Sequence, residues 1–531
     1  MHRLTGGEAI VRQLEREGVD VVFGIAGVHT LDIYDALIDS EIEQITTRHE
    51  QGAGFMADGY ARTTGRVGVT LLITGPGLTN AATPIGQAYS DSSPMLIISS
   101  ENETNEASRG KGYLHEVKDQ QGMMENLVAY SERVERVSDI PRAIADAFDY
   151  LETNRPRPVH IQIATDLLER TEPVEPFDRP EPSLPPIDDD RLDRAVDMLA
   201  DAEQPLLLLG GGASGATEEI RQFVDRTGIP VASTVAGKGI VPADHERNLG
   251  ATLRDPDVSE YASDRDLVLA VGTQLSPMDT RGIDFTENLI HVDIDYRNFG
   301  RTYPTELGIV GDAERAMDEL LDRVEERDIS FGDEHREAVA ELKADGLGYP
   351  TDEDDQRHQI LAALRDALDS DAVVVNDMTK LCYEASGTFP ADEPDTFLFP
   401  RGYGTLGFSP PAAFGAGVGN PDRQVVGLVG DGGFLFTVQA LSTAVKYDIG
   451  VPIVVINDEC YGVLEDNQVR DYDGRTIGTR IENPEFVEMA RTFGAAGERL
   501  DVDEVDTALP DALAAAFERD RPTVIEIPVD F

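Results

Sequence analysis

Residues 425–458 read VVGLVGDGGFLFTVQALSTAVKYDIGVPIVVIND, and they indicate the class of fold. Two apolar, largely β-branched runs, at residues 425–430 and 451–456, have the length of buried strands. The segment between them, TVQALSTAVKY at residues 437–447, has helical spacing. A strand, a helix and a second strand predict a parallel sheet that is covered by helices on both faces.

Glycine and aspartate residues follow these two strands: Gly430, Asp431, Gly432 and Gly433 after the first, and Asp458 after the second. Glycines between a strand and a helix let backbone N–H groups approach phosphate oxygens. A carboxylate among them would repel phosphate unless a cation lies between the two. Mg²⁺ is often held by one or two carboxylates together with substrate phosphates. The spacing therefore indicates one Mg²⁺ that holds a diphosphate. The alternative is a tight glycine turn, with Asp458 as a helix cap.

Similar strands alternate with helical segments along the whole chain, and residues 7–18 and 191–202 are two such segments. This alternation predicts an α/β fold made of doubly wound parallel sheets. The other expected strands are VDVVFG (19–24), VGVTLLITG (67–75), MLIISS (95–100), VHIQI (159–163), LLLLGGG (206–212), LVLAVG (267–272), LIHVDID (289–295), AVVVND (372–377) and TVIEIPV (523–529).

Two segments without strand patterns divide the chain. Residues 171–190 contain six prolines and are expected to form an extended linker. Residues 329–356 contain a short helical piece and an acidic end. We therefore expect three domains, at residues 1–170, 190–328 and 352–531, each of ordinary domain size.

The 531 residues include 45 basic and 100 acidic side chains, a formal net charge of -55, and six of the basic residues are lysines. Such acidity argues against binding nucleic acid or an anionic membrane surface. It suggests the salt-rich cytoplasm of a halophile, because at about 1 M salt the screening length is only about 3 Å; an acidic protein in ordinary salt is the alternative. The two cysteines suit a reducing compartment, and the apolar runs are too short to cross a bilayer. The N-terminus lacks a signal-peptide pattern, so we expect a cytoplasmic protein.

Several of these motifs together resemble one enzyme family. GDGGF (430–434) and ALSTAVKYDIGVPIVVINDECYG (440–462) are similar to the diphosphate–metal motif of thiamine diphosphate (ThDP) enzymes. Residues 46–63, TTRHEQGAGFMADGYART, and residues 73–100 resemble the pyrimidine-binding domain of the acetolactate synthase family. GIAGVHTLDIYDAL (24–37) and GKGYLHEVKDQQGMMENL (110–127) look closest to the branch that contains guanidino-oxopentanoate decarboxylase and acetolactate-synthase-like enzymes. The resemblance implies a pyrimidine-binding, a central and a diphosphate-binding domain, in that order.

The resemblance assigns roles to acidic residues. Glu50 matches the glutamate that hydrogen-bonds the pyrimidine N1′ of the cofactor; the alternative is an ion pair with Arg48 or Arg62. Asp431 and Asp458 match metal-ligand positions, and the backbone carbonyl of Cys460 matches a third. Many family members have Asn where this chain has Asp458, so the site carries one more negative charge beside the diphosphate.

Other positions match cofactor contacts. Gly404 matches a carbonyl that accepts from the 4′-amino group, and Leu406 matches the apolar residue that bends the cofactor, although it could be plain core. Thr379 and Lys380 fall where the family contacts diphosphate, with a solvated lysine as the alternative. Tyr461, Gly462, Val463 and Leu464 follow the metal loop and are expected to line the pocket.

His29, His49 and His115 are candidates for substrate handling, His49 the weakest, although a lone histidine is more often structural. Asn80 either points a donor at the reacting centre or caps the following helix. Gly210–Gly215 satisfy the GxGxxG pattern, but the acidic residue expected about 20 positions later is missing. FAD in the central domain, as in some members of the family, is therefore the weaker expectation.

The resemblance implies a ThDP- and Mg²⁺-dependent enzyme that decarboxylates a 2-oxo acid through an enamine. Protonation of the enamine releases an aldehyde, which we prefer. Addition to a second 2-oxo acid, as in acetolactate synthase, is the alternative. Many synthases have a Trp shortly after the metal loop; this chain has none, and Asn467 lies near that position. A flavin or nicotinamide oxidoreductase and a non-catalytic paralogue are remote alternatives. The family's sites lie between subunits, so we expect a homodimer or homotetramer.

Overall fold

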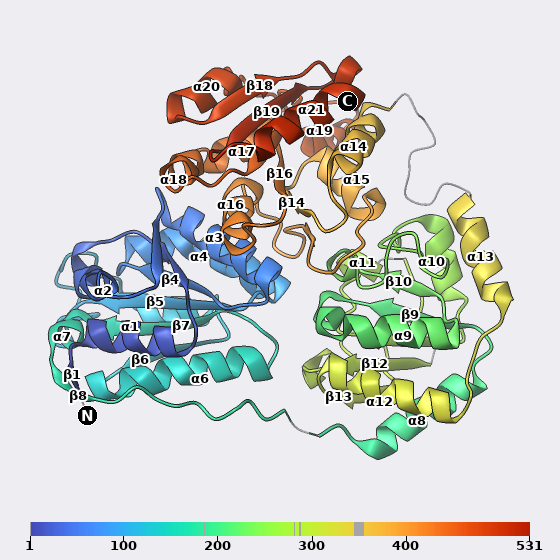
Figure 1. Cartoon of the computed structure of the whole chain (residues 1–531), viewed down its shortest axis with the longest axis horizontal. Helices are drawn as coiled ribbons and strands as arrows, with labels where there is room; N and C mark the ends of the chain where they lie inside the picture. Colours follow the sequence, from blue (N-terminus) through green and yellow to red (C-terminus); the bar gives the residue numbers. More distant parts are fainter. Residues whose placement is uncertain (1, 185, 281, 286–287, 345–354, 531) are drawn as a thin grey trace.

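A computed structural model describes residues 2–184, 186–280, 282–285, 288–344 and 355–530. Three α/β domains follow one another along the chain (Figure 1). Each domain is built on one all-parallel sheet, which confirms the predicted fold class. The three sheets lie inside the three predicted segments, while the predicted domain ends at residues 1, 352 and 531 lie outside the described residues.

The first domain contains a six-stranded sheet in the order β3-β2-β4-β5-β7-β6. Its strands are β2 (Val21–Gly24), β3 (Glu43–Thr46), β4 (Gly68–Leu72), β5 (Met95–Glu101), β6 (Tyr130–Val134) and β7 (Val159–Ala164). Its helices are α1 (Gly6–Arg16), η1 (Val28–Thr30), α2 (Leu31–Leu37), α3 (Glu50–Thr64), α4 (Pro76–Asp91), α5 (Gln120–Glu125), η2 (Val137–Asp139), α6 (Ile140–Thr153) and α7 (Thr165–Glu169).

The central domain contains a five-stranded sheet in the order β10-β9-β11-β12-β13. Its strands are β9 (Pro205–Leu209), β10 (Val231–Ser233), β11 (Leu267–Val271), β12 (Leu289–Asp293) and β13 (Leu307–Val310). Its helices are α8 (Asp189–Asp201), η3 (Gly211–Ala216), α9 (Thr217–Thr227), η4 (Val235–Gly237), α10 (Pro256–Ser263), α11 (Pro277–Thr280), η5 (Tyr296–Asn298), α12 (Ala313–Glu326) and α13 (Asp333–Ala344). Helix α13, the predicted helical piece, packs on this domain through the buried Val339.

The third domain contains a six-stranded sheet in the order β15-β14-β16-β17-β19-β18. Its strands are β14 (Val373–Asn376), β15 (Phe397–Leu398), β16 (Val425–Gly430), β17 (Pro452–Asn457), β18 (Ala496–Arg499) and β19 (Thr523–Pro528). Its helices are α14 (Gln356–Ala367), α15 (Lys380–Thr388), α16 (Ser409–Gly419), α17 (Asp431–Thr437), α18 (Ala440–Lys446), α19 (Gly462–Asp471), α20 (Phe486–Phe493), η6 (Val502–Glu504) and α21 (Val505–Phe517).

The predicted linker is partly structured. Strand β8 (Glu172–Val174) pairs antiparallel with β1 (His2–Leu4), so the first domain extends beyond residue 170. Val174 is buried in the core of that domain, which explains why a proline-containing segment is held against it. Helix α8 begins at Asp189, so the extended part is shorter than the predicted 171–190.

Helices α3 and α16 join the first and third domains in close contact (Figure 1). A methyl group on Gly59 would lie 2.0 Å from the carbonyl oxygen of Ala412, and one on Gly415 would lie 1.9 Å from that of Met56. Phe55 and Phe408 pack edge to face beside this contact, with ring centroids 5.5 Å apart. The two backbones therefore pack at a distance that only glycine permits. In the described part of the chain, no helix is both long enough and apolar enough to cross a membrane.

Candidate active site

The first part of the candidate site lies at the carboxyl ends of three neighbouring strands of the third domain. Strands β14, β16 and β17 are adjacent and parallel, so the residues that follow them meet at one edge of the sheet. Asp431 follows β16 and is the first residue of α17, so GDGG is not a loop ahead of a helix that starts near residue 437, as the sequence suggested. An aspartate in the first turn is favoured there by the helix dipole.

The Asp431 carboxylate is buried and oriented by two donors. Its Oδ1 accepts from the Gly432 amide at 2.8 Å, and its Oδ2 accepts from Asn483 Nδ2 at 2.6 Å. Asn483 Nδ2 also donates to Asn457 Oδ1 at 3.0 Å, so one amide group ties together the ends of β16 and β17. Burial raises the pKa of Asp431 above its usual value. Sequence reasoning missed Asn483, which belongs to no motif and lies far along the chain.

Asp458 provides a second carboxylate beside the first. Burial, and then the negative charge of Asp431, raise its pKa to about 6. Its Oδ1 accepts from the Cys460 amide at 3.2 Å, whereas α19 begins only at Gly462, so Asp458 does not cap that helix. A buried carboxylate and a half-buried one whose pKa it raises are a fitting pair of ligands for a divalent cation.

Cys460 could bind a metal through its backbone carbonyl oxygen rather than through its sulfur. The side chain is buried, and burial raises the pKa of its thiol to about 11, which keeps the sulfur protonated. Among the described residues, no group of three or more His, Cys, Asp or Glu side chains is arranged to bind a metal. A cation on Asp431 and Asp458 would therefore take its other ligands from backbone oxygen and from a ligand such as diphosphate, the hard-oxygen set that Mg²⁺ prefers.

Glycines let neighbouring side chains pack closely against the backbone beside the two carboxylates. A methyl group on Gly430 would lie 3.0 Å from Thr379 Oγ1, and one on Gly432 would lie 2.5 Å from the ring of Tyr461. Thr379 and Lys380 begin α15, while Gly462 and Val463 begin α19. The structure thus places the predicted diphosphate contacts around the glycines that follow β16 and β17.

Asp377, at the end of β14, shapes the loop that carries Gly404 and Leu406. Its carboxylate accepts from the backbone amides of Met378 (2.8 Å), Gly407 (3.1 Å) and Ser409 (2.9 Å). Gly404 has φ +74°, a conformation that favours glycine, and Leu406 is half-buried rather than plain core. Sequence reasoning missed Asp377, although a polar residue directly after the strand AVVVN was a usable signal.

The second part of the candidate site lies in the first domain. Glu50 is the first residue of α3, and its Oε2 accepts from Asn80 Nδ2 at 2.9 Å. Asn80 lies inside α4, whose N-cap is Gly75, so it is not a helix cap. The alternative partners of Glu50 are engaged elsewhere: Arg62 pairs with Asp91 at 3.2 Å, and Arg48 donates to Ser442.

His29 and His115 lie together, and His49 lies apart with a structural role. The rings of His29 and His115 meet edge to face with centroids 5.4 Å apart. Burial, and then the charge of His115, lower the pKa of His29, whose Nδ1 has no hydrogen-bond partner among the described residues. His115 Nδ1 lies 3.2 Å from the carbonyl oxygen of Thr74. His49 Nδ1 accepts from the Gln51 amide and caps α3.

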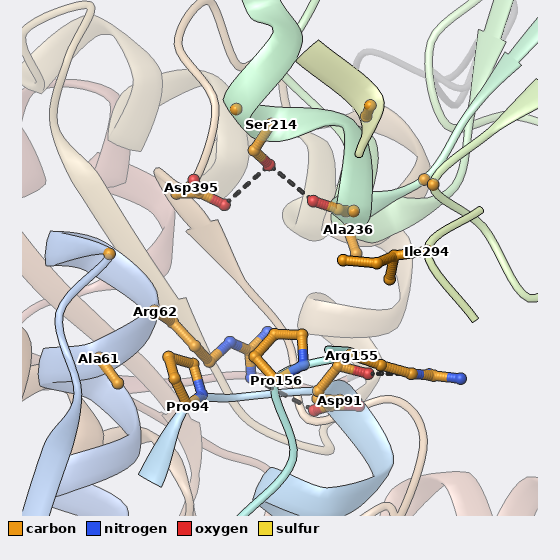
Figure 2. Close-up of a pocket in the computed structure, with 18 of the residues that line it drawn as sticks. Ala61, Arg62, Asp91, Pro94, Arg155, Pro156, Ser214, Ala236, Ile294 and Asp395 are labelled. Carbon is orange, nitrogen blue, oxygen red and sulfur yellow. Dashed lines mark hydrogen bonds and ion pairs between the residues drawn. The ribbon is translucent and has the colours of Figure 1, made fainter. Parts of the chain in front are cut away.

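A cavity of about 710 Å³ lies between the domains, lined partly by the Gly210–Gly215 segment and by none of Glu50, Asp431 or Asp458 (Figure 2). Asp395 Oδ1 accepts from Ser214 Oγ at 3.1 Å in this segment. Burial raises the pKa of Asp395 to about 6, so the carboxyl is mostly ionised at neutral pH. The cavity is also lined by Arg62, Arg155, Lys238 and Arg401, so its charges do not exclude a diphosphate, and FAD stays the weaker prediction.

Three known domain families match the chain, one in each of the three domains. The N-terminal TPP-binding domain of thiamine pyrophosphate enzymes matches residues 4–123, their central domain matches residues 192–320, and their C-terminal TPP-binding domain matches residues 377–527. The chain belongs to the thiamine pyrophosphate enzyme family. Thiamine pyrophosphate is ThDP, so the predicted family is confirmed.

Similar members of the thiamine pyrophosphate enzymes include both activities considered above. A probable 2-ketoarginine decarboxylase, AruI, of Pseudomonas aeruginosa is 40% identical over 99% of this chain and 94% of that protein. The acetolactate synthase large subunit of Corynebacterium glutamicum is 34% identical over 99% of this chain and 86% of that protein. A probable acetolactate synthase large subunit of Methanocaldococcus jannaschii is 32% identical over 99% of this chain and 92% of that protein.

Proposed function

We propose that this thiamine pyrophosphate enzyme decarboxylates a 2-oxo acid with ThDP and Mg²⁺ and releases an aldehyde. The observation that carries the proposal is the Glu50 carboxylate, held by Asn80 at 2.9 Å, in a chain that also carries the Asp431–Asp458 carboxylate pair. The similarity to the 2-ketoarginine decarboxylase favours this outcome over carboligation. That relative's name also makes 2-ketoarginine the first substrate to test.

The residues of this chain have separable tasks. When bound, ThDP supplies the electron sink for the pair left by departing CO₂. Glu50 would hold a proton at the pyrimidine N1′, and Asn80 fixes the direction of that carboxylate. Asp431 and Asp458 would hold Mg²⁺, with the carbonyl of Cys460. Nearby Thr379 and the glycine amides offer donors to the diphosphate.

His29 and His115 would place polar groups at the substrate. Because burial lowers the pKa of His29, its ring is neutral at pH 7 and offers both a donor and an acceptor. A neutral ring would orient the 2-oxo acid by hydrogen bonds without adding a fixed charge. The substrate's own carboxylate could then accept from the neutral His29 ring, and a neutral donor would not oppose its loss as CO₂.

We further propose that Glu50 of one subunit meets the metal site of another. No described hydrogen bond or ion pair joins Glu50, His29 or His115 to Asp431 or Asp458. Exposed apolar side chains flank both parts. Val28 (69% exposed) and Leu114 (59%) lie beside the two histidines, and Leu464 (56%) and Ile477 (85%) lie near the metal loop. Apolar patches beside both half-sites are what a subunit interface would cover.

Acetolactate synthase-type carboligation remains a second candidate, because two relatives with that name are 32% and 34% identical to this chain. The absence of any Trp, and Asn467 on α19 near the position where many synthases carry one, argue mildly against it.

The test is to incubate the purified protein, loaded with ThDP and Mg²⁺, with 2-ketoarginine, pyruvate and an aliphatic 2-oxo acid. Release of CO₂ with one equivalent of aldehyde would support decarboxylation. Formation of an acetohydroxy acid from pyruvate would support the second candidate instead. Glu50→Gln should remove either activity while ThDP still binds; full activity of this variant would contradict the role of Glu50.

A further inference from the structure

The extra carboxylate Asp458 needs a compensating charge. A site with Asp431, Asp458 and a diphosphate carries more negative charge than one Mg²⁺ neutralises. Like charges held close together in a partly buried site destabilise one another unless a cation lies beside them. A site with two carboxylates that binds a diphosphate tightly should therefore contain a further cation.

Lys380 provides this cation. It is the first residue of α15, and its side chain is only 15% exposed. A methyl group on Gly462 would lie 2.5 Å from Asp458 Oδ2 and 2.6 Å from Lys380 Cε, so both side chains border the same point. Glycine at position 462 is what lets the two side chains approach.

A third residue fixes the position of the ammonium group. Lys380 Nζ lies 2.9 Å from Oδ2 and 3.1 Å from Oδ1 of Asp466, on α19. Asp466 is 62% exposed, so solvent weakens this ion pair, whereas Lys380 itself is largely buried. The contact holds the lysine over the start of α19 without neutralising it as a buried partner would.

We propose that Lys380 is the counter-charge of Asp458, so that a metal site with two carboxylates can accept a diphosphate. This inference rests on the proposed ThDP–Mg²⁺ function and deepens it. It goes beyond a simple phosphate contact, because it makes the need for the lysine depend on the charge at position 458. Replacing Lys380 should therefore weaken the binding of ThDP mainly in a chain that contains Asp458.

Calorimetric titration of ThDP with Mg²⁺ into four proteins tests this dependence without measuring activity. The four are the unaltered chain, Lys380→Met, Asp458→Asn and the double variant. We expect Lys380→Met to weaken binding about tenfold or more, since an uncompensated carboxylate remains in the site. The double variant should bind ThDP at least about threefold more tightly than Lys380→Met. Asp458→Asn alone should not tighten binding.

The inference is overturned if the double variant binds no more tightly than Lys380→Met, because the two effects would then be independent. Lys343→Met removes a lysine that donates to the carbonyl oxygens of Ala243 and His245 in the central domain, and it should leave the dissociation constant unchanged. Circular dichroism confirms folding, and Lys380→Gln replaces Lys380→Met if the latter does not fold. Failure of the unaltered chain to bind ThDP would overturn the proposed function, and this inference with it. Normal binding without rescue would overturn the inference alone.

Discussion

The hydrogen bond from Asn80 Nδ2 to Glu50 Oε2, at 2.9 Å, links two helices that begin at the same edge of the first sheet. The sequence predicted Glu50 and Asn80 as separate candidates but not the hydrogen bond between them, because Asn80 is 30 positions away on α4 and its partner depends on how α3 and α4 pack. Asn483 was missed because it reaches Asp431 from a distant segment, whereas Asp377 was missed although it directly follows a predicted strand. Residues within a motif can be predicted from local spacing, whereas those that orient them from another segment cannot.

Asn80→Ala should lower kcat about tenfold and leave the affinity for ThDP nearly unchanged, because the carboxylate remains but loses its fixed direction. The loss should be smaller than that caused by Glu50→Gln. Steady-state kinetics with calorimetric ThDP binding measure both quantities. Asn80→Asp is the matched comparison: it keeps the shape but replaces the donor with a carboxylate, and it should be worse than alanine. Unchanged kcat in Asn80→Ala would show that Glu50 needs no such donor.

Asp58, on α3, is a buried carboxyl whose two oxygens have no hydrogen-bond partner among the described residues. Burial raises its pKa to about 6, against the opposing charge of Arg62. The folded state therefore holds this proton more tightly than the unfolded state, and ionisation removes stability as pH rises from about 4 to about 6.

Asp58→Asn should consequently raise the free energy of unfolding at pH 7 by about 2–3 kcal/mol. The gain should shrink as the pH falls from about 6 to about 4, where Asp58 is protonated in both states. Denaturant unfolding at several pH values measures it. Asp35→Asn, on the exposed side of α2, is the control and should show no such trend. A gain that did not vary with pH would contradict the raised pKa.

At the scale of elements, the strands in the middle of the three sheets were all predicted, and those at the edges were all missed. The edge strands are β3 and β6, β10 and β13, and β15 and β18. Four of them are partly exposed, and β10 and β15 have only three and two residues. A long apolar run arises only where a strand is covered on both faces, so an edge strand lacks the pattern that identifies its neighbours.

The close packing of α3 against α16 is a feature that the periodicity of the sequence does not predict. Gly59→Ala would place a methyl group 2.0 Å from the carbonyl oxygen of Ala412, so the helices would have to separate. We expect a loss of about 3 kcal/mol in unfolding free energy. Gly52→Ala, two turns earlier on α3 with no atom within 4 Å of the added methyl group, should instead be neutral or stabilising by up to about 1 kcal/mol. Equal effects of the two substitutions would contradict the close packing.

At the scale of the whole molecule, co-expression of Glu50→Gln with Asp431→Asn tests whether each site draws on two chains. In a mixed dimer, one site would contain both substitutions and the other would contain none. Random pairing should therefore restore about a quarter of the normal activity, although each variant alone is inactive. No recovery in a preparation that light scattering shows to be oligomeric would place both parts of the site in one chain.

The halophilic origin and the cytoplasmic location of the protein stay predictions. The formal net charge is -55, and acidic residues occur throughout the sequences of all three domains. Screening of like charges in a salt-rich cytoplasm is the predicted reason for this composition.

The close packing of α3 against α16 couples the movements of these two helices. Helix α3 starts at Glu50, and α16 follows the loop that holds Gly404 and Leu406, so the two packed helices connect predicted residues of both parts of the candidate site. If each active site is shared between two subunits, a movement of α3 on substrate binding at one site would be transmitted through α16 to the other site. Paired centres built in this way would be expected to work in turn rather than independently.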